Sequence, residues 1–221
     1  MTLFRPIWPV HTERLLLRPF QDDDLQALYT MQSDEAVVRY LYHDARSLDE
    51  VRSVLARKIA RVAVEGEGDG LSAAVVLRDT GELVADSSLW VFSEAHQQGE
   101  LGFGVHPAHQ RRGYATEAAR PMLDFAFGTM GLHRVIGRTE ARNVSSARVL
   151  EKLGMRREAH LMENEWVKGE WQSELVYAVL AAEWSTLTSR EVTNSAGSAL
   201  GFGQSALRLA AIGGHTRRIH S

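Results

Sequence analysis

One basic turn with a glycine constrains this chain more than any other stretch. An apolar, strand-like run from Leu101 to Val105 leads towards Gln110-Arg111-Arg112-Gly113, and a helical pattern of small residues begins near Tyr114. Where a strand passes through a glycine turn into a helix, backbone N–H groups without a helical acceptor can face an anion. The two arginines add charge that can pair with phosphate oxygens. The turn therefore indicates a cradle for a pyrophosphate, and a solvated basic turn is the alternative that local physics leaves open.

Composition narrows the classes of protein that can carry such a turn. The chain has 221 residues, of which 44% are apolar and 24% charged, as expected for a soluble globular protein with a sizeable core. Its net charge of −3 gives no general electrostatic reason to bind nucleic acid or an anionic membrane, so affinity for a polyanion must come from a local patch. The N-terminus lacks the apolar stretch of a signal peptide, and no apolar run reaches the length of a membrane span, which favours a cytoplasmic protein.

Cysteine and histidine usage excludes several kinds of site. The chain contains no cysteine, which rules out disulfides, thiolate metal sites and a cysteine nucleophile. Its nine histidines show no metal-ligand spacing, so no metal site is predicted. His106 and His109 flank the basic turn and are expected to be solvated loop residues, with contact to substrate or phosphate as the alternative.

The hydrophobic pattern predicts an irregular succession of strands and helices. Strands are expected over 12–19, 71–77, 83–92, 100–105, 134–141 and 171–180, with further extended structure over 155–159 and 161–167. Helices are expected over 22–31, over 47–63 after a capping box at Ser47, over 114–130 with a kink at Pro121, and over 144–153 between Asn143 and Gly154. A hairpin before the central helix favours an α+β or mixed α/β fold over a doubly wound one.

The last part of the chain has a different character. Ser, Thr, Asn and Gly dominate the stretch from Ser185 to Gly203, and Phe202 is the only aromatic residue of the tail. Such a segment cannot bury enough apolar surface to fold alone. We therefore expect one domain over residues 1–184 and a low-complexity extension over 185–221, flexible or with one short helix from Gln204 to Ile212.

The turn and the order of elements resemble the GNAT superfamily of N-acetyltransferases. Gln110 to Ala115 fits the acetyl-CoA motif of that family, Gln/Arg-x-x-Gly-x-Gly/Ala, at every fixed position. Four segments look more narrowly like the subfamily that acetylates ribosomal proteins at an N-terminal alanine or serine: Thr12 to Pro19, Glu100 to Phe103, Asn143 to Met155, and Gly169 to Trp184. The resemblance covers residues 11–184. It implies a GNAT-like fold, in which helices flank a central, mostly antiparallel mixed sheet.

The resemblance also implies that acetyl-CoA is the acetyl donor. Backbone N–H groups from Arg111 to Thr116 would hold the pyrophosphate, and Gly113, lacking Cβ, would let the phosphate approach the backbone closely. The strand edge at Phe103 and Val105 would bond the pantetheine amides, and an N–H near Val105 would donate to the oxyanion. The residues expected to bind acetyl-CoA are Phe103, Val105, Gln110, Arg111, Arg112, Gly113, Tyr114, Ala115, Thr116 and Asn143, the last of which also caps a helix.

Two residues are candidates for proton transfer. Glu100 begins the strand before the turn, where partial burial would raise its pKa towards a value useful for a general base. The alternatives are an exposed strand-end carboxylate and a base acting through water. Many GNAT enzymes carry a tyrosine at the position of Leu150, so the role of thiolate acid is vacant there, and the subfamily resemblance offers the Ser146 hydroxyl instead. The alternative for Ser146 is an ordinary serine in the first turn of a helix.

The activity predicted is direct transfer of an acetyl group to a primary amine in a ternary complex, since a cysteine acyl-enzyme is impossible. The amine is a protein N-terminus in the subfamily that the chain resembles. A small amine, such as an antibiotic or a polyamine, and a non-catalytic acyl-CoA sensor are the alternatives, and a homodimer is left open. The acceptor pocket is expected in the loops around residues 20–45 and 160–170. Trp90, Trp166 and Trp171 are expected to pack on the sheet, and the alternative is that some of them border an acceptor cleft.

Overall fold

The computed structural model of the chain describes residues 4–190. The chain divides into a unit from Met1 to Ala181 and a unit from Ala182 to Ser221. Of the second unit, residues 182–190 are described, and they are helical. Helical structure thus extends past residue 184, where the sequence pattern predicts the domain to end. The short helix expected from Gln204 to Ile212 lies outside the described residues.

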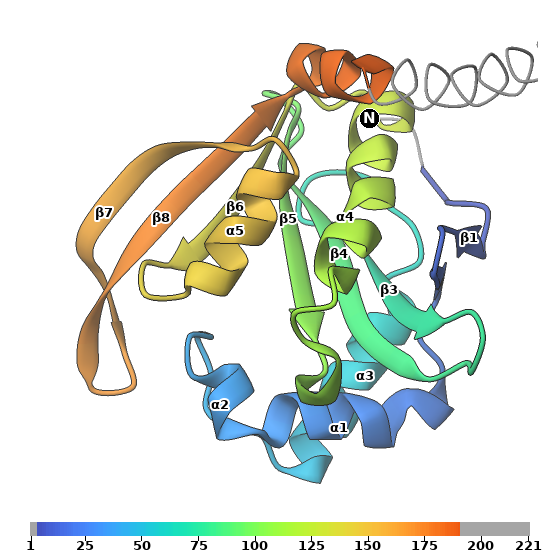
Figure 1. The fold of residues 1–221 in the computed structure, drawn as a ribbon, viewed down its shortest axis with the longest axis vertical. Coiled ribbons are helices and arrows are strands. Elements are labelled where there is room, and N and C mark those ends of the chain that lie inside the picture. Colours follow the sequence, from blue (N-terminus) through green and yellow to red (C-terminus); the bar gives the residue numbers. More distant parts are fainter. Residues whose placement is uncertain (1–3, 191–221) are drawn as a thin grey trace, which may run out of the picture. The chain divides into compact units, whose positions relative to one another are not determined.

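A mixed sheet of eight strands organises the first unit (Figure 1). The order of the strands is β1-β2-β3-β4-β5-β6-β8-β7, and every neighbouring pair is antiparallel except β5 and β6. The strands are β1 (Val10–His11), β2 (Leu15–Arg18), β3 (Gly70–Leu77), β4 (Leu83–Ser93), β5 (Gln98–Val105), β6 (Arg134–Glu140), β7 (Arg156–Val167) and β8 (Glu170–Leu180). The α+β fold with a mostly antiparallel mixed sheet is therefore confirmed.

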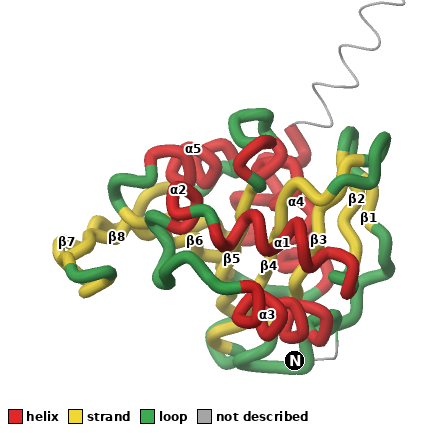
Figure 2. Tube along the Cα trace, turned by 90° about the horizontal axis from the view of Figure 1, so that it is seen from below, coloured by secondary structure: helices red, strands yellow, loops and turns green. Residues whose placement is uncertain are grey.

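Helices cover both faces of this sheet. Figure 2 shows α4 and α5 on one side of the strands and α3 on the other, and α1 packs against α3. The helices are α1 (Leu25–Ser33), α2 (Glu35–Val38), α3 (Leu48–Ala60), α4 (Tyr114–Asp124) and α5 (Val144–Lys152), and short 3-10 turns cover Asp22–Asp24 and Pro107–His109. Within the described part of the chain, no helix combines the length and the apolar character that crossing a membrane requires.

Local signals placed several of these helix ends correctly. The Ser47 hydroxyl accepts a hydrogen bond from the Glu50 N–H (3.4 Å), and the Glu50 carboxylate accepts one from the Ser47 N–H (2.7 Å), which is the predicted capping box. Gly154 follows the C-cap residue of α5, Leu153, and adopts a left-handed φ of +78°, as a helix-terminating glycine should.

The predicted helix over 114–130 differs from the observed one. Helix α4 continues through Pro121 to Asp124, and a π-helical segment, Phe125–Thr129, follows it. The irregularity therefore comes after Pro121 and not at it. The two-residue strand β1 and the single-turn helix α2 were not predicted, because elements so short carry no hydrophobic period to detect.

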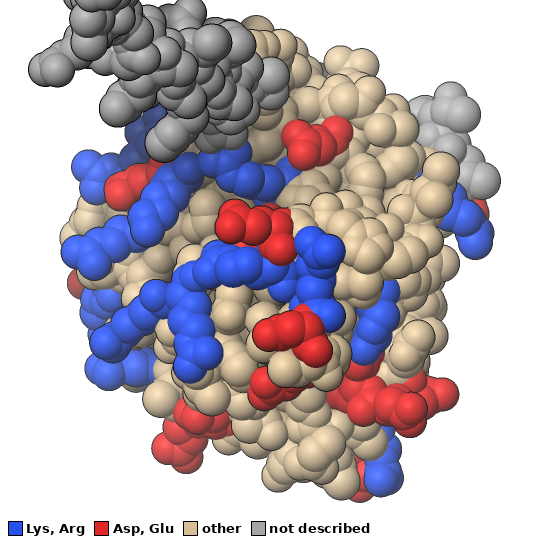
Figure 3. Space-filling view, turned by 45° about the vertical axis from the view of Figure 1, so that its right-hand side comes forward, with Lys and Arg blue, Asp and Glu red and all other residues tan. Residues whose placement is uncertain are grey.

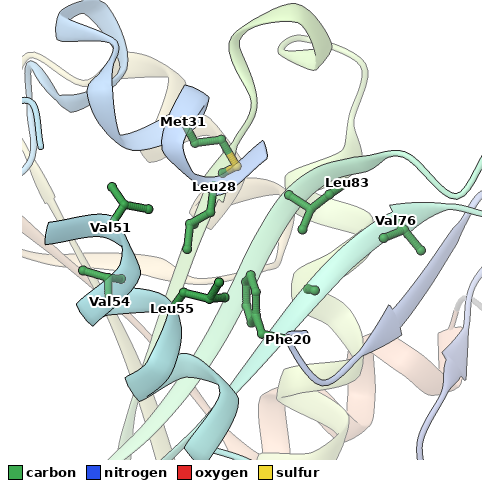
Figure 4. Close-up of a cluster of buried hydrophobic side chains, with 9 residues drawn as sticks. Phe20, Leu28, Met31, Val51, Val54, Leu55, Val76 and Leu83 are labelled. Carbon is green, nitrogen blue, oxygen red and sulfur yellow. The ribbon is translucent and has the colours of Figure 1, made fainter. Parts of the chain in front are cut away.

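A compact apolar cluster fastens α1 and α3 to the sheet (Figure 4). It consists of Phe20, Leu28, Met31, Val51, Val54, Leu55, Ala74, Val76 and Leu83, all nearly inaccessible to solvent. On the other face, α4 buries Ala118, Ala119, Met122 and Leu123 and contacts β4 and β5. Because alanine is small, the start of α4 can lie close to these strands.

The parallel junction of β5 and β6 positions the site. The pairing of β5 with β6 is limited to three residues of each strand. These are Gln98, Gly99 and Glu100 of β5, which lie opposite Arg134, Val135 and Ile136 of β6. Past Glu100 the two strands separate, and Figure 1 shows β6 running with β8 while β5 continues beside β4. The separated part of β5 leads through the 3-10 turn Pro107–His109 into the basic turn and α4.

Candidate functional site

The basic turn has the backbone conformation of an anion-binding loop. Arg111 and Gly113 both have a left-handed φ, +62° and +84°, and Gly113 is the N-cap of α4. The first helical hydrogen bond runs from the Glu117 N–H to the Gly113 carbonyl (3.1 Å). Within residues 4–190, no acceptor bonds the N–H groups from Arg111 to Thr116. These N–H groups can therefore be offered to a ligand at the positive end of the helix dipole.

The side chains of the turn separate into exposed and buried groups. Gln110, Arg111 and Arg112 are exposed, which leaves their polar groups accessible to an anion. Tyr114 and Ala115 are buried and Thr116 is half-buried, so these three contribute backbone N–H groups to the turn while their side chains anchor α4. The Gln110 amide also donates to the Val105 carbonyl (3.4 Å), which ties the turn to the end of β5.

The free edge of β5 faces the gap left by β6. The His106 N–H donates to the Val84 carbonyl of β4 (2.8 Å). Because the direction of backbone groups alternates along an antiparallel pair, the N–H and carbonyl groups of Phe103 and Val105 point the other way, into the gap. Both side chains are half-buried. An extended ligand lying in the gap would find strand-like donors and acceptors there.

Two glycines leave β5 bare on the face covered by α1 and α3. A Cβ at Gly102 would lie 2.7 Å from the Ser88 hydroxyl oxygen, and one at Gly104 would lie 2.6 Å from a carboxylate oxygen of Asp86. Asp86 forms a 2.5 Å ion pair with Lys58 of α3, and both side chains are largely buried. These polar side chains of β4 therefore occupy the space above β5 that larger residues would fill.

Glu100, the predicted base, lies at the point where the strands separate and is ion-paired with Arg138. Arg138 of β6 donates from Nε and Nη2 to the two carboxylate oxygens of Glu100, at 3.1 and 2.9 Å. This hydrogen bonding raises the pKa of Arg138 above its ordinary value. The Glu100 side chain is 27% exposed, so the pair is accessible from solvent.

A second carboxylate, Glu174 of β8, shares the same guanidinium. One of its oxygens lies 3.9 Å from Nη1 of Arg138 and accepts a hydrogen bond from the Tyr42 hydroxyl (2.8 Å). Glu174 is only 3% exposed. Burial and the hydrogen bond to Glu174 raise the pKa of Tyr42, so its hydroxyl stays protonated at neutral pH.

Arg138, Glu174 and Tyr42 were not identified from the sequence. The one available signal was a charged residue inside an apolar strand pattern, as at Glu174 before Leu175 and Val176, because such residues are seldom buried without a purpose. That signal points to Glu174, but it does not predict which residues contact Glu174. The contact with Arg138 depends on the pairing of β6 with β8, and the contact with Tyr42 joins residues 132 positions apart.

Helix α5 carries the remaining predicted residues. The Asn143 side chain accepts from the Ser146 N–H (3.1 Å), which is the expected N-cap. Both residues are half-buried, and within residues 4–190 the Ser146 hydroxyl makes no hydrogen bond. Leu150 is buried against β6, where a Cβ at Gly137 would lie 2.5 Å from it, so this position serves the core.

Several aromatic and histidine predictions were wrong. His109 is buried rather than solvated, and its Nε2 lies 2.8 Å from the Glu82 carboxylate. Trp166 and Trp171 pack on each other at the end of the β7–β8 hairpin but remain 61% and 56% exposed. Only Trp90 is half-buried as expected, with the Arg61 guanidinium 4.1 Å above its ring.

The surface charges are unevenly spread. Figure 3 shows Lys and Arg side chains gathered over one half of the face in view, with a few Asp and Glu among them. Around the turn and α5, Arg111, Arg112, Arg148 and Lys152 are exposed. A chain of net charge −3 thus has the local basic surface that anion binding requires.

The described residues also form a cavity that is separate from this cluster. A cavity of about 420 Å³ lies beside β1 and α4, lined in part by Val10, Pro121 and Phe125, and away from Glu100 and Arg138. It is not part of the cluster at the strand junction. Within residues 4–190, no three His, Asp or Glu residues are grouped so that they could hold a metal ion.

Both comparisons of the amino-acid sequence with known proteins find similarity to acetyltransferases. Residues 14–156 match the acetyltransferase (GNAT) domain family. The chain is 32% identical over 177 residues to the uncharacterized N-acetyltransferase YnaD of Bacillus subtilis (strain 168), covering 80% of this chain and 99% of that protein.

Solved structures agree with this match. An acetyltransferase (GNAT family) from Bacillus anthracis superposes with a TM-score of 0.71 at 29% identity, over 79% of this chain and 99% of that one. Spermidine N-acetyltransferase from Vibrio cholerae, in complex with CoA and spermine, superposes with a TM-score of 0.67 at 20% identity, over 78% of this chain and 99% of that one.

Proposed function

The chain belongs to the GNAT family of acetyltransferases and is an N-acetyltransferase that uses acetyl-CoA, and from this premise we propose that its acceptor is the α-amine of a polypeptide. Transfer occurs directly in a ternary complex. The amine nitrogen attacks the thioester carbonyl carbon, the amine proton passes to a base, the carbon–sulfur bond breaks, and the thiolate takes up a proton.

The donor is assigned to the gap between β5 and β6 and to the turn that follows. The N–H groups from Arg111 to Thr116 would take the pyrophosphate, because no acceptor within residues 4–190 bonds them. The free backbone groups of Phe103 would bond the pantetheine amides, and so would the Val105 carbonyl, which accepts one bond from the Gln110 side chain and has a second lone pair. The Val105 N–H would then be available to the oxyanion that forms at the thioester carbon.

The charge balance around Arg138 carries the proposal for the acceptor. Glu100 and Glu174 share one guanidinium, so the three groups together hold one negative charge. A single ammonium group would neutralise that charge at low cost in desolvation. A polypeptide presents one α-ammonium at its N-terminus, whereas a polyamine carries several positive charges.

Proton transfer is assigned to Glu100, with Ser146 at the thiolate. The two-point ion pair with Arg138 holds the Glu100 carboxylate where β5 and β6 separate. An α-amine titrates near pH 8, so a modest base, acting directly or through water, suffices. The Ser146 hydroxyl makes no hydrogen bond within residues 4–190 and can donate one to the leaving sulfur.

A small amine is the second candidate, and one comparison favours it. The Vibrio cholerae structure of similar fold is a spermidine acetyltransferase. In addition, Arg142 is shared by Glu140 and Glu170, a second group of two carboxylates and one guanidinium at the same end of β6. A longer cation could bridge the two groups.

Thiol release from acetyl-CoA distinguishes these acceptors. The panel contains short peptides beginning with Ala or Ser, the same peptides with a blocked N-terminus, spermidine, and an aminoglycoside. We expect turnover with the free peptides and none with the blocked ones. A higher kcat/KM for spermidine or the aminoglycoside would overturn the peptide proposal, and CoA binding without turnover of any acceptor would support the sensor.

A further inference from the structure

The segment before β2 makes a dense set of hydrogen bonds with the first turn of α4. The Glu117 carboxylate accepts from the Thr12 hydroxyl (2.6 Å), from the Arg14 backbone N–H (2.8 Å) and from the Arg14 Nε (2.7 Å). Nη2 of Arg14 lies 2.7 Å from the same carboxylate. Arg14 and Glu117 are 103 positions apart, so these bonds attach the N-terminal segment to the helix that follows the pyrophosphate turn.

Arg14 makes a further contact with the turn itself. Its Nη1 donates to the Arg112 carbonyl (2.9 Å), and its guanidinium lies 4.8 Å from the centre of the Tyr114 ring. A Cβ on Gly113 would be 3.3 Å from Nη2 of the same guanidinium. One side chain thus contacts the turn on both sides of its glycine.

This contact determines where one N–H of the turn points. In a trans peptide the carbonyl and the N–H point in opposite directions. Because Arg14 holds the Arg112 carbonyl, the Gly113 N–H is directed away from Arg14 and towards the side left free for the anion. Without that bond the peptide plane could rotate at Gly113, whose φ/ψ freedom is the largest of any residue.

The negative charge of the Glu117 carboxylate gives its ion pair with Arg14 a second role. Burial raises the pKa of Glu117, but hydrogen bonds from Thr12 and Arg14 outweigh that effect and lower it below its ordinary value, so the carboxylate is ionised at neutral pH. An ionised carboxylate in the first turn of α4 would repel a bound pyrophosphate. Arg14 compensates that charge.

We propose that Arg14 is a positioning residue for the acetyl-CoA cradle, which orients the Gly113 N–H through the Arg112 carbonyl and neutralises Glu117. The inference rests on the proposed placement of the pyrophosphate at residues 111–116 and is independent of the acceptor. It gives a role to the Thr12-to-Pro19 motif, which the assignment of the donor and acceptor sites left unexplained.

The test compares two donors that differ in the pyrophosphate. Acetyl-pantetheine has the thioester and both amides of acetyl-CoA but no phosphate. In Arg14→Gln, KM for acetyl-CoA should rise about tenfold, the effect of losing a charge-assisted hydrogen bond. The kcat/KM for acetyl-pantetheine should stay unchanged. Arg14→Lys keeps the charge but cannot contact Glu117 and Arg112 together, so its KM should fall between those of the wild type and Arg14→Gln.

The matched control is Arg52→Gln, which removes an exposed arginine that pairs with Asp49 within α3. It should leave KM unchanged for both donors. An equal loss with both donors in Arg14→Gln, or no loss with acetyl-CoA, would overturn the positioning role. If Arg14→Gln does not fold, Arg14→Lys carries the same comparison. A wild-type protein that binds no CoA would contradict the placement of the donor itself, an outcome separate from any effect of Arg14.

Discussion

The proposed donor and acceptor sides of this site are built in different ways. The proposed donor side consists of consecutive backbone N–H groups of one turn and the free edge of one strand, all between Phe103 and Thr116. The proposed acceptor side consists of side chains that come from β5, β6, β8 and the loop after α2, and it spans residues from Tyr42 to Glu174. Backbone groups supply the first side and ion-paired side chains the second.

This difference explains why one side can be recognised locally. Backbone donors follow from the conformation of a few adjacent residues, and glycine, proline and strand patterns report that conformation directly. An ion-paired cluster follows from strand register, which brings together residues that no local pattern connects. Mutations should therefore affect the two sides by different means, through backbone conformation on the donor side and through charge on the acceptor side.

The largest effect is expected from Gly113→Asp, which alters the donor side and lowers the affinity for CoA. A residue with a Cβ at a φ of +84° costs about 1–2 kcal/mol, and the added carboxylate repels the pyrophosphate as well. Affinity for CoA, measured by titration calorimetry, should fall at least about 100-fold.

Gly113→Ala separates the two causes, because it adds the strain without the charge. Its loss of CoA affinity should be about tenfold. A Gly113→Asp protein that folds and binds CoA as tightly as the wild type does would remove the cradle assignment.

A somewhat smaller effect is expected from Glu100→Gln, which alters the acceptor side and lowers kcat. Removing a general base should lower kcat about tenfold or more while leaving the affinity for CoA unchanged. The loss should grow as the pH falls, because more of the amine is then protonated and must lose its proton at the site. A pH–rate profile of kcat for both proteins measures it.

Glu174→Gln is the comparison variant for Glu100. It keeps the predicted base but removes one of the two charges that share Arg138, so it should raise KM for the acceptor more than it lowers kcat. If Glu100→Gln instead raises only the acceptor KM, Glu100 binds the ammonium and does not accept its proton.

The smallest effects are expected at the start of α5. Asn143→Ala removes the N-cap and should lower the free energy of unfolding by about 1 kcal/mol, visible as a lower thermal midpoint. Ser146→Ala keeps the N–H that the cap uses, so the midpoint should change little. Its kcat should fall about fivefold, the value of one neutral hydrogen bond. An unchanged kcat would leave Ser146 as an ordinary helix serine.

The sequence allowed most of the fold to be predicted, for physical reasons that particular residues illustrate. Several helix ends are marked by a hydrogen bond or a φ angle that involves only near neighbours. These are the start of α3 at Ser47 and Glu50, the start of α4 at Gly113, and the two ends of α5 at Asn143 and Gly154. The continuous apolar run of β3 and the apolar patterns of β4 and β8 were equally local signals. These features are short in range, so one sequence is enough to locate them.

The interior of the site was less accessible to prediction. Glu100 was recognised by its place at the start of β5, but its pairing with Arg138 needed the β5–β6 junction. The buried His109 contacts Glu82, which lies in another turn. The exposure of Trp166 and Trp171 depends on how far the hairpin extends past its neighbours. Each of these depends on contacts between distant segments.

The short junction of β5 and β6 has a mechanical consequence. The sheet is joined there by three residue pairs, while the ladders on either side, β4 with β5 and β6 with β8, run nearly the whole length of their strands. The junction thus has fewer residue pairs than the ladders beside it, and the pantetheine amides would extend it by acting as an inserted strand. Donor binding should then stiffen the whole sheet, and amide exchange at Phe103 and Val105 would slow as the enzyme loads its donor.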